Sequence, residues 1–456
     1  MRRKVLFFLL FLLLLGQKNI FADGVSVTSS SELEEAIRYS QSGDTIILEE
    51  GTYEGEFVIR NSISLRGKSG AIIKGPSSGY PITIEAENVV IENLQIEGGG
   101  SQNAGIYIKA NHTQVLNNII KNVFHGVYIK DGYGNVIENN TITSRAGEKT
   151  HKGFGVYLVD APYTKVSGNY FHNLQDGVYV SFSDYCEVSN NLIEYARYGV
   201  HTMDSKTVTI AKNEIKNSHN GLMIMQSDEL YITGNFLHSN TTIDGAGMFI
   251  FDTFDSVIKA NVMKENFKGI YFENAKRNTV EFNAVIQNDI GFDLAKDTTD
   301  NVITFNNFLK NTKQVISRPE NTNSFTKDGY GNYWDDQRLI NLNGDLFIDF
   351  PYKSGDIFFN MTADEPLLQI FFQSPSVYLW NRIEQFTPIP TSHYIVDEHP
   401  LTKTVPISLG NTEIGSSKIS EDKKSHYDSF QISLLVFFVS GSGLILWKTR
   451  RSNNEI

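Results

Sequence analysis

A repeat of about 22 residues constrains this chain more than any other feature of its sequence. Short segments that begin with glycine recur along the 456 residues, and the steps between them are 21, 29, 22, 22, 22, 26, 22 and 22. The glycines are Gly105, Gly126, Gly155, Gly177, Gly199, Gly221, Gly247, Gly269 and Gly291. A fixed period of short β-type segments is typical of a solenoid in which one repeat makes one coil.

A second series, of asparagines, keeps the same period. Asparagine suits a tight left-handed turn, and identical amides stacked coil on coil can hydrogen-bond along the stack. We therefore expect these residues to be structural and not catalytic. The series is Asn118, Asn140, Asn169, Asn191, Asn213, Asn235, Asn261, Asn283 and Asn307.

The first and third residues after each glycine are apolar almost throughout, so strand alternation should send them inward. We predict an all-β fold, a right-handed parallel β-helix solenoid of about 22-residue coils, over residues 23–327. The segments "GDTIILEEGTYEGEFVI" and "ITIEAENVVIENLQI" are predicted to form its first coils. Ser31 to Tyr39 is expected to be an N-terminal capping helix, with Ser31 and Glu34 as a capping box.

Composition limits both the stabilising devices and the partners of this fold. Cys186 is the only cysteine, so no internal disulfide can form, and its inward position predicts a buried, inert thiol. Burial of aliphatic side chains must supply the stability instead. The formal net charge of −12 argues against nucleic acid as a partner, because no basic field would attract phosphate.

Two apolar runs predict export and anchoring. Residues 1–22 have a basic start and an apolar run that ends at Ala22, which indicates a signal peptide. Residues 430–447 are long enough for a transmembrane helix, and the basic residues that follow favour a cytoplasmic tail at 448–456. With 406–429 as a linker, the body would lie outside the cytoplasm, anchored by a C-terminal transmembrane helix in the membrane.

The repeat lengthens at two places, near Ser144 to Lys152 and His238 to Ala246. Both insertions fall between an asparagine and the next glycine, so they should lie at the same corner of the coil. Four coil steps separate them, which is roughly 19 Å at about 4.8 Å per coil. That spacing suits a binding groove, although solenoid loops also lengthen where they do no harm.

The outward residues of the glycine segments predict a candidate metal site. Met223 and Met225 should point out of the coil, and their neighbours on the previous coil are His201 and Met203. Three thioethers and an imidazole form a soft ligand set that suits transient Cu(I) binding. The alternative interpretation is an adaptable protein interface built from flexible methionines.

Two other features of the same face suggest different chemistry. The second residues after the glycines form a row that includes Tyr107, Tyr128, Tyr157 and Tyr179, which could stack on sugar rings or dock a partner protein. Asp131 and Asp160 occupy equivalent positions on consecutive coils. Such a carboxylate pair could bind Ca²⁺ or act as acid and base in a polysaccharide lyase, epimerase or hydrolase, and it could equally cap two turns.

A different kind of sequence follows the repeats, in a predicted C-terminal capping region at 328–405. Asn341, Asn343, Asp345 and Asp349 are spaced around Gly344 like oxygen ligands of a calcium loop, and also like an ordinary Asx-rich turn.

The residues Gly331-Asn332-Tyr333-Trp334 followed by Asp336, then Asn343-Gly344-Asp345, Asp349 and Pro351-Tyr352, resemble the closing motif of the NosD family. The resemblance extends to the first predicted coil and to Ser374-Pro375-Ser376-Val377-Tyr378-Leu379, and it covers most of residues 31–401. The chain departs from the family pattern at residues 341–349, where the usual acidic, glycine-rich loop loses charge and two glycines. A metal role for that loop is thereby put in doubt.

The resemblance implies an exported, non-catalytic β-helix accessory protein for maturation of the copper sites of nitrous oxide reductase. Such a protein would work with the permease and ATPase of an ABC transporter and with a copper chaperone lipoprotein, and would pass copper to the apo reductase in the periplasm. The alternatives that remain open are a surface polysaccharide enzyme that uses Asp131 and Asp160, and a plain surface adhesin.

Overall fold

The computed structural model describes residues 24–147, 152–317, 322–337, 340–354, 366–371, 374–384, 395–409 and 412–414. All of them belong to the first of two compact units, residues 1–414, and the second unit comprises residues 415–456. The predicted signal peptide 1–22, anchor 430–447 and tail 448–456 therefore lie outside the described residues, as does most of the predicted linker. Within the described ranges, no helix combines the length and the apolar character that a membrane crossing requires.

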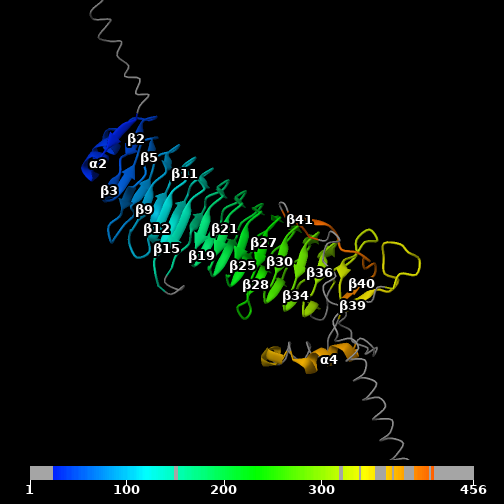
Figure 1. The fold of residues 1–456 in the computed structure, drawn as a ribbon. Helices are drawn as coiled ribbons and strands as arrows, with labels where there is room; N and C mark the ends of the chain where they lie inside the picture. The colour runs from blue at the N-terminus through cyan, green and yellow to red at the C-terminus, as the bar shows by residue number, and fades with distance from the viewer. Residues whose placement is uncertain are drawn as a thin grey trace, which may run out of the picture. The chain divides into compact units, whose positions relative to one another are not determined.

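The strands stack coil on coil into three parallel sheets, as the sequence predicted (Figure 1). The first sheet has 13 strands: β1 (Val25–Val27), β2 (Thr45–Leu48), β5 (Ser64–Gly67), β8 (Val90–Glu92), β11 (Gln114–Leu116), β14 (Val136–Glu138), β17 (Lys165–Ser167), β20 (Glu187–Ser189), β23 (Thr209–Ala211), β26 (Tyr231–Thr233), β29 (Val257–Lys259), β32 (Thr279–Glu281) and β35 (Val302–Thr304).

The second sheet contains the repeated glycine segments, and we call it the glycine sheet. Its 12 strands are β4 (Phe57–Ile59), β7 (Ile82–Ile84), β10 (Ala104–Ile108), β13 (His125–Lys130), β16 (Val156–Val159), β19 (Asp176–Ser181), β22 (Tyr198–Met203), β25 (Asn220–Met225), β28 (Ala246–Phe251), β31 (Lys268–Glu273), β34 (Ile290–Leu294) and β37 (Lys313–Ser317).

The third sheet again has 13 strands: β3 (Gly51–Glu54), β6 (Ala71–Lys74), β9 (Gln95–Glu97), β12 (Ile119–Val123), β15 (Thr141–Ser144), β18 (Tyr170–His172), β21 (Leu192–Glu194), β24 (Glu214–Lys216), β27 (Phe236–His238), β30 (Val262–Lys264), β33 (Ala284–Ile286), β36 (Asn307–Leu309) and β38 (Tyr333–Trp334). The remaining elements are the helix α2 (Ser30–Tyr39), two antiparallel strand pairs, β39 (Tyr352–Ser354) with β40 (Ile395–Asp397) and β41 (Ile407–Leu409) with β42 (Thr412–Ile414), the 3₁₀-helix η2 (Pro366–Phe371) and the helix α4 (Pro375–Glu384).

The repeated glycines are required because successive coils approach closely at this position. A Cβ atom on Gly155 would lie 2.5 Å from the carbonyl oxygen of Gly177, and one on Gly177 would lie 2.6 Å from that of Gly199. Neither distance is compatible with a side chain. The residues that follow each glycine then alternate as predicted, so that Val178 and Val180 are fully buried in the core of the solenoid.

The asparagine stack exists, with two corrections to the prediction. Asn191 donates both its backbone N–H and its side-chain amide to the amide oxygen of Asn213, each at 3.0 Å. The left-handed residue is the one before the stacked asparagine in every coil up to that of Asn306, such as Asn190 with φ 55°, because the turn must be made before the amide can point inward. We call the stack the asparagine ladder, and its members are Asn118, Asn140, Asn169, Asn191, Asn213, Asn235, Asn261, Asn283, Asn306 and Asn332.

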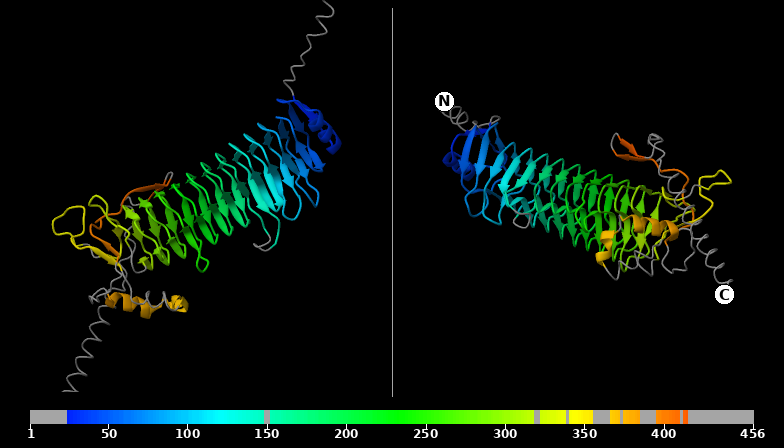
Figure 2. Two further views of the ribbon diagram at one scale, coloured as in Figure 1. Left: turned by 180° about the vertical axis from the view of Figure 1, so that it is seen from behind. Right: turned by 60° about the horizontal axis from the view of Figure 1, so that its bottom comes forward.

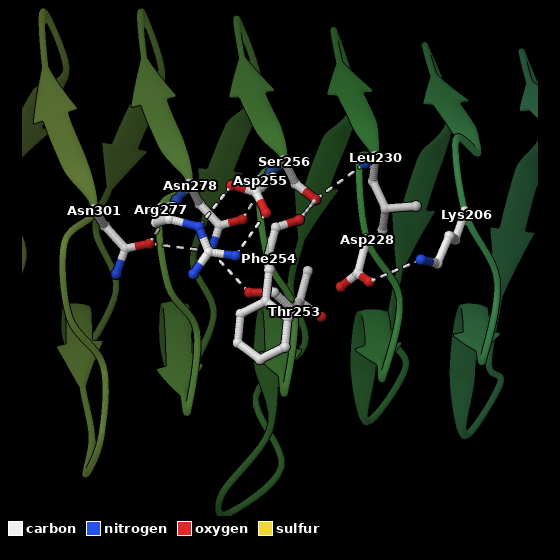
Figure 3. Close-up of polar contacts among 10 residues, drawn as sticks. All are labelled: Lys206, Asp228, Leu230, Thr253, Phe254, Asp255, Ser256, Arg277, Asn278 and Asn301. Atoms are coloured by element: carbon white, nitrogen blue, oxygen red, sulfur yellow. Dashed lines mark hydrogen bonds and ion pairs between the residues drawn. The ribbon is translucent and has the colours of Figure 1, made fainter.

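The last expected member, Asn307, is therefore not part of the ladder. Its side chain instead bonds the backbone of Val405, to whose carbonyl oxygen it donates at 2.7 Å. A parallel ladder of mixed residues runs through another corner, where Leu230 donates to Ser256 Oγ, Ser256 to Asn278 and Asn278 to Asn301 (Figure 3). From the coil of Asn118 to that of Asn332, each coil thus provides a side chain that accepts a backbone N–H from the coil before it.

Both ends of the solenoid are capped. Leu33 and Ile37 of α2 are buried against the first coil. The cap of α2 is Ser29 and not the expected Ser31: Ser29 has an extended backbone and accepts the N–H of Glu32, whose carboxylate accepts the N–H of Thr28 at 2.7 Å. The capping pair is therefore Ser29 and Glu32, two residues earlier than predicted.

At the other end, the closing motif continues the solenoid. The fully buried indole of Trp334 stacks between Phe308 at 4.3 Å and Tyr352 at 4.1 Å, and its Nε1 donates to the carboxylate of Asp397 at 2.9 Å. Asn332 of the same motif is the last member of the asparagine ladder. These contacts account for the motif as a structural cap.

Candidate functional site

The strand register brings the four predicted ligand residues together on the outer face of the glycine sheet. His201 on β22 pairs with Met223 on β25, and Met203 pairs with Met225. The residue between the two methionines, Ile224, is fully buried on the inner face. We call these four outward residues the His–Met patch.

The patch is more enclosed than its outward position suggests. His201 and Met223 are each only 7% exposed, and Met203 and Met225 are half-buried. The Tyr179 ring stacks on the His201 imidazole at 4.3 Å with an angle of 9°, and Tyr198 packs against it edge-on. The imidazole is therefore held between aromatic rings, away from bulk water.

Asp176 fixes the orientation and tautomer of the imidazole. This carboxylate is fully buried, and its Oδ2 lies 3.0 Å from His201 Nδ1. Arg197 donates two hydrogen bonds to the same carboxylate, at 2.9 and 2.8 Å. Because a carboxylate only accepts hydrogen bonds, Nδ1 is the donor in this contact, and in the neutral form of the imidazole the lone pair is then on Nε2.

The other ring nitrogen, Nε2, is buried and has no hydrogen-bond partner among the residues that the structure describes. A buried acceptor without a partner costs about 1–3 kcal/mol, so an unpaired Nε2 requires an explanation. A carboxylate that orients a histidine whose other nitrogen is free is the usual arrangement behind a metal ligand. The residues present therefore fit a soft metal ion.

Two thioethers of the His–Met patch carry only weak interactions. Asn220 Nδ2 donates to Met223 Sδ at 3.4 Å, and Tyr179 Oη donates to Met203 Sδ at 3.3 Å. Hydrogen bonds to a thioether sulfur are weak, and methionine has three flexible torsions. Both sulfur atoms can therefore exchange these contacts for a metal ion at low cost.

The sequence alone did not identify Asp176 as part of the site. It stands directly before Gly177, a position occupied in neighbouring coils by Phe154, Tyr198 and Asn220. The one hint in the sequence is that Asp176 is an acid at a position where the neighbouring coils have uncharged residues. Only the fold shows that residues before and after the glycine of adjacent coils meet across the sheet.

The other candidates from the sequence have structural settings. Asp131 and Asp160 are exposed and left-handed, with φ of 54° and 48°, directly after strands of the glycine sheet, as expected for turn residues. Asn341, Asn343, Asp345 and Asp349 accept or donate hydrogen bonds within their own loop, including the backbone N–H groups of Leu342 and Gly344. In the described ranges, no three His, Cys, Asp or Glu residues form a cluster that could hold a metal ion.

Cys186 is buried, as predicted, and burial raises the pKa of its thiol to about 12.

The tyrosine row forms a continuous series of ring contacts, with ring separations of 5.2 Å for Tyr107 and Tyr128, 4.8 Å for Tyr128 and Tyr157, and 5.3 Å for Tyr157 and Tyr179. Burial raises the pKa of Tyr128 to about 12.

The two insertions lie at the same corner of the coil, between β15 and β16 and between β27 and β28, where the second projects as a loop (Figure 2).

Comparison with solved structures identifies the fold and nothing more specific. The Dettilon tailspike protein (gp208) shares 15% sequence identity and has a TM-score of 0.54, over 65% of this chain and 66% of that one. The Family 28 exopolygalacturonase of Yersinia enterocolitica shares 10% identity with a TM-score of 0.50, over 66% of this chain and 79% of that one.

Comparison by sequence is more specific. A family model described as "Periplasmic copper-binding protein (NosD)" matches residues 23–201 and 145–338. The "Probable ABC transporter binding protein NosD" of Stutzerimonas stutzeri is 36% identical over 377 residues, which cover 77% of this chain and 85% of the relative. The protein of the same name from Pseudomonas aeruginosa is 34% identical over 375 residues, which cover 77% of this chain and 87% of the relative. The chain belongs to the NosD family.

Proposed function

We propose that the protein is a non-catalytic, extracytoplasmic accessory protein that carries copper to nitrous oxide reductase during assembly of its copper sites. The observation that carries the proposal is the buried Nε2 of His201, which has no hydrogen-bond partner among the described residues, on a ring oriented by Asp176 and on a sheet face that also carries Met203, Met223 and Met225. Copper is here the cargo of the protein.

The donor set favours Cu(I) over harder ions. Thioether sulfur and neutral imidazole are soft ligands, whereas Ca²⁺ and Mg²⁺ take oxygen ligands. No carboxylate would bind the ion directly, because the only acid at the patch, Asp176, already binds Arg197 and His201. A site of weakly held methionines also suits release, as a carrier requires.

The proposed partners follow from the family. The description of the family model as periplasmic and copper-binding supports the location and the cargo, and the names of the two relatives support an ABC transporter as a partner. We extend this to the transporter's permease and ATPase, a copper chaperone lipoprotein that loads the patch, and the apo reductase that receives the metal.

The test is the Cu(I) affinity of the double variant Met223→Leu and Met225→Leu, measured anaerobically by competition with a chromogenic Cu(I) chelator. Loss of two thioether ligands should weaken binding about 100-fold or more, at about 1.4 kcal/mol for each factor of ten. Met248→Leu is the matched control, because Met248 lies on the next strand, β28, and points into the core. Unchanged affinity in a folded double variant would remove the site.

A further inference from the structure

Within residues 366–380, the described parts, 366–371 and 374–380, expose large apolar side chains of the kind that the solenoid buries. In η2, Leu367 is 80% exposed, Ile370 77% and Phe371 48%. In α4, Tyr378, Leu379 and Trp380 are each more than half exposed. In the solenoid, by contrast, inward residues such as Val178 and Ile224 are fully buried.

The same segment carries no charge. The 15 residues PLLQIFFQSPSVYLW contain no Asp, Glu, Lys or Arg, although 20% of the chain is charged, which would on average place three charged residues there. Exposed apolar surface without charged residues to keep it hydrated mixes poorly with water. This surface therefore requires an apolar medium or partner.

The arrangement of the exposed residues favours a lipid surface over a protein groove. A groove that binds a helix contacts one stripe, at i, i+3, i+4 and i+7. Tyr378, Leu379 and Trp380 are consecutive, so at about 100° per residue they spread widely around α4. Tyrosine and tryptophan are also the residues enriched where a bilayer meets water.

The length of these helices limits them to the interface. At about 1.5 Å per residue, the 10 residues of α4 extend for about 15 Å, half of a hydrocarbon core of about 30 Å.

We propose that residues 366–371 and 374–380 form a membrane-interface segment, in which Leu367, Ile370, Phe371, Tyr378, Leu379 and Trp380 insert among lipid headgroups and upper acyl chains. The proposal does not depend on copper binding.

Tryptophan fluorescence tests the proposal directly, because the chain has only three tryptophans and each has a different environment. Trp334 is fully buried in the C-terminal cap, Trp380 is exposed, and Trp447 lies in the predicted anchor. The full-length W447F variant, reconstituted into phosphatidylcholine vesicles that contain brominated lipid, should lose about half of its emission, since Trp380 is one of its two remaining tryptophans. The W380F/W447F variant should lose almost none.

A second variant tests the apolar surface itself. In the W447F background, the triple substitution of Leu367, Ile370 and Phe371 by serine should abolish most of the quenching by lipid, whereas Leu342→Ser, at an 86% exposed residue outside the segment, should preserve it. Emission from Trp380 that aqueous acrylamide quenches and brominated lipid does not would overturn the proposal. Insensitivity of Trp380 to both agents would do the same, because protein would then cover it.

Discussion

Two histidines on the glycine sheet, His125 and His201, lie in similar surroundings, but Nδ1 accepts a hydrogen bond in one ring and donates one in the other. Both lie in contact with aromatic rings, His125 with Phe154 and Tyr157 and His201 with Tyr179. His125 Nδ1 accepts the backbone N–H of Phe154 at 3.0 Å, whereas His201 Nδ1 donates to the carboxylate of Asp176. The two rings are therefore in opposite tautomers.

The difference shows that the neighbouring group, and not burial, decides what a histidine can do. Burial lowers the pKa of His125 to about 4, and among the described residues no carboxylate is hydrogen-bonded to its ring, so at neutral pH it is a neutral packing residue that accepts a hydrogen bond. The carboxylate beside His201 instead fixes the proton on Nδ1 and leaves Nε2 free to bind a ligand. The following predictions test this contrast, from the largest expected effect to the smallest.

The largest effect should be acid destabilisation through His125. Its folded pKa of about 4 lies below the unfolded value of 6.5, so its contribution to the free energy of unfolding is complete above pH 6.5 and is lost as the pH falls towards 4. This difference between the folded and the unfolded pKa corresponds to about 3 kcal/mol in the free energy of unfolding. Urea unfolding of the wild type and the His125→Gln variant, at pH 7 and pH 4, should show that the substitution removes about this much of the pH dependence.

The control for this experiment is His112→Gln, because His112 is exposed. That variant should keep the wild-type pH dependence. Equal pH dependence in the wild type and the His125→Gln variant would show that His125 does not stay neutral in the folded state.

The next effect concerns Asp176, a positioning residue. Asp176→Asn replaces a charged acceptor with a weaker, neutral one, and loss of such an orienting partner typically lowers metal affinity by about 10- to 100-fold. Cu(I) competition measures the loss, and ¹⁵N chemical shifts of the His201 ring should show that the Nδ1–H tautomer is no longer the sole form. The matched control is Asp160→Asn, an exposed acid on the same sheet. An unchanged tautomer together with unchanged affinity would contradict the role of Asp176.

The smallest expected effect is on the Cu(I) affinity of a variant at His125, compared with a variant at His201. His125→Gln should change the Cu(I) affinity by no more than about twofold, because the ring serves only packing, while His201→Gln should lower it by at least about tenfold. Both are measured by chelator competition at pH 7, where both variants are folded. Equal losses in the two variants would mean that copper binds elsewhere on the sheet.

Much of the fold could be predicted because each coil repeats the same physical requirements. The glycines recur because backbone from the next coil lies where a Cβ would be, and the inward apolar residues alternate because a strand does. Boundaries were less predictable. The ladder uses Asn306 and not Asn307, and α2 is capped by Ser29 and not Ser31, because neighbouring residues of similar chemistry compete for the same position.

The sequence by itself determined the repeat, and with it the outward direction and the coil-to-coil adjacency of His201, Met203, Met223 and Met225. These follow from periodicity, which is local information. Only the tertiary structure decided that Asp176 meets Arg197 and His201, which lie 21 and 25 residues further along the chain. Side-chain contacts between coils depend on rotamers and on the chain's path around a whole coil, and a one-dimensional pattern contains neither.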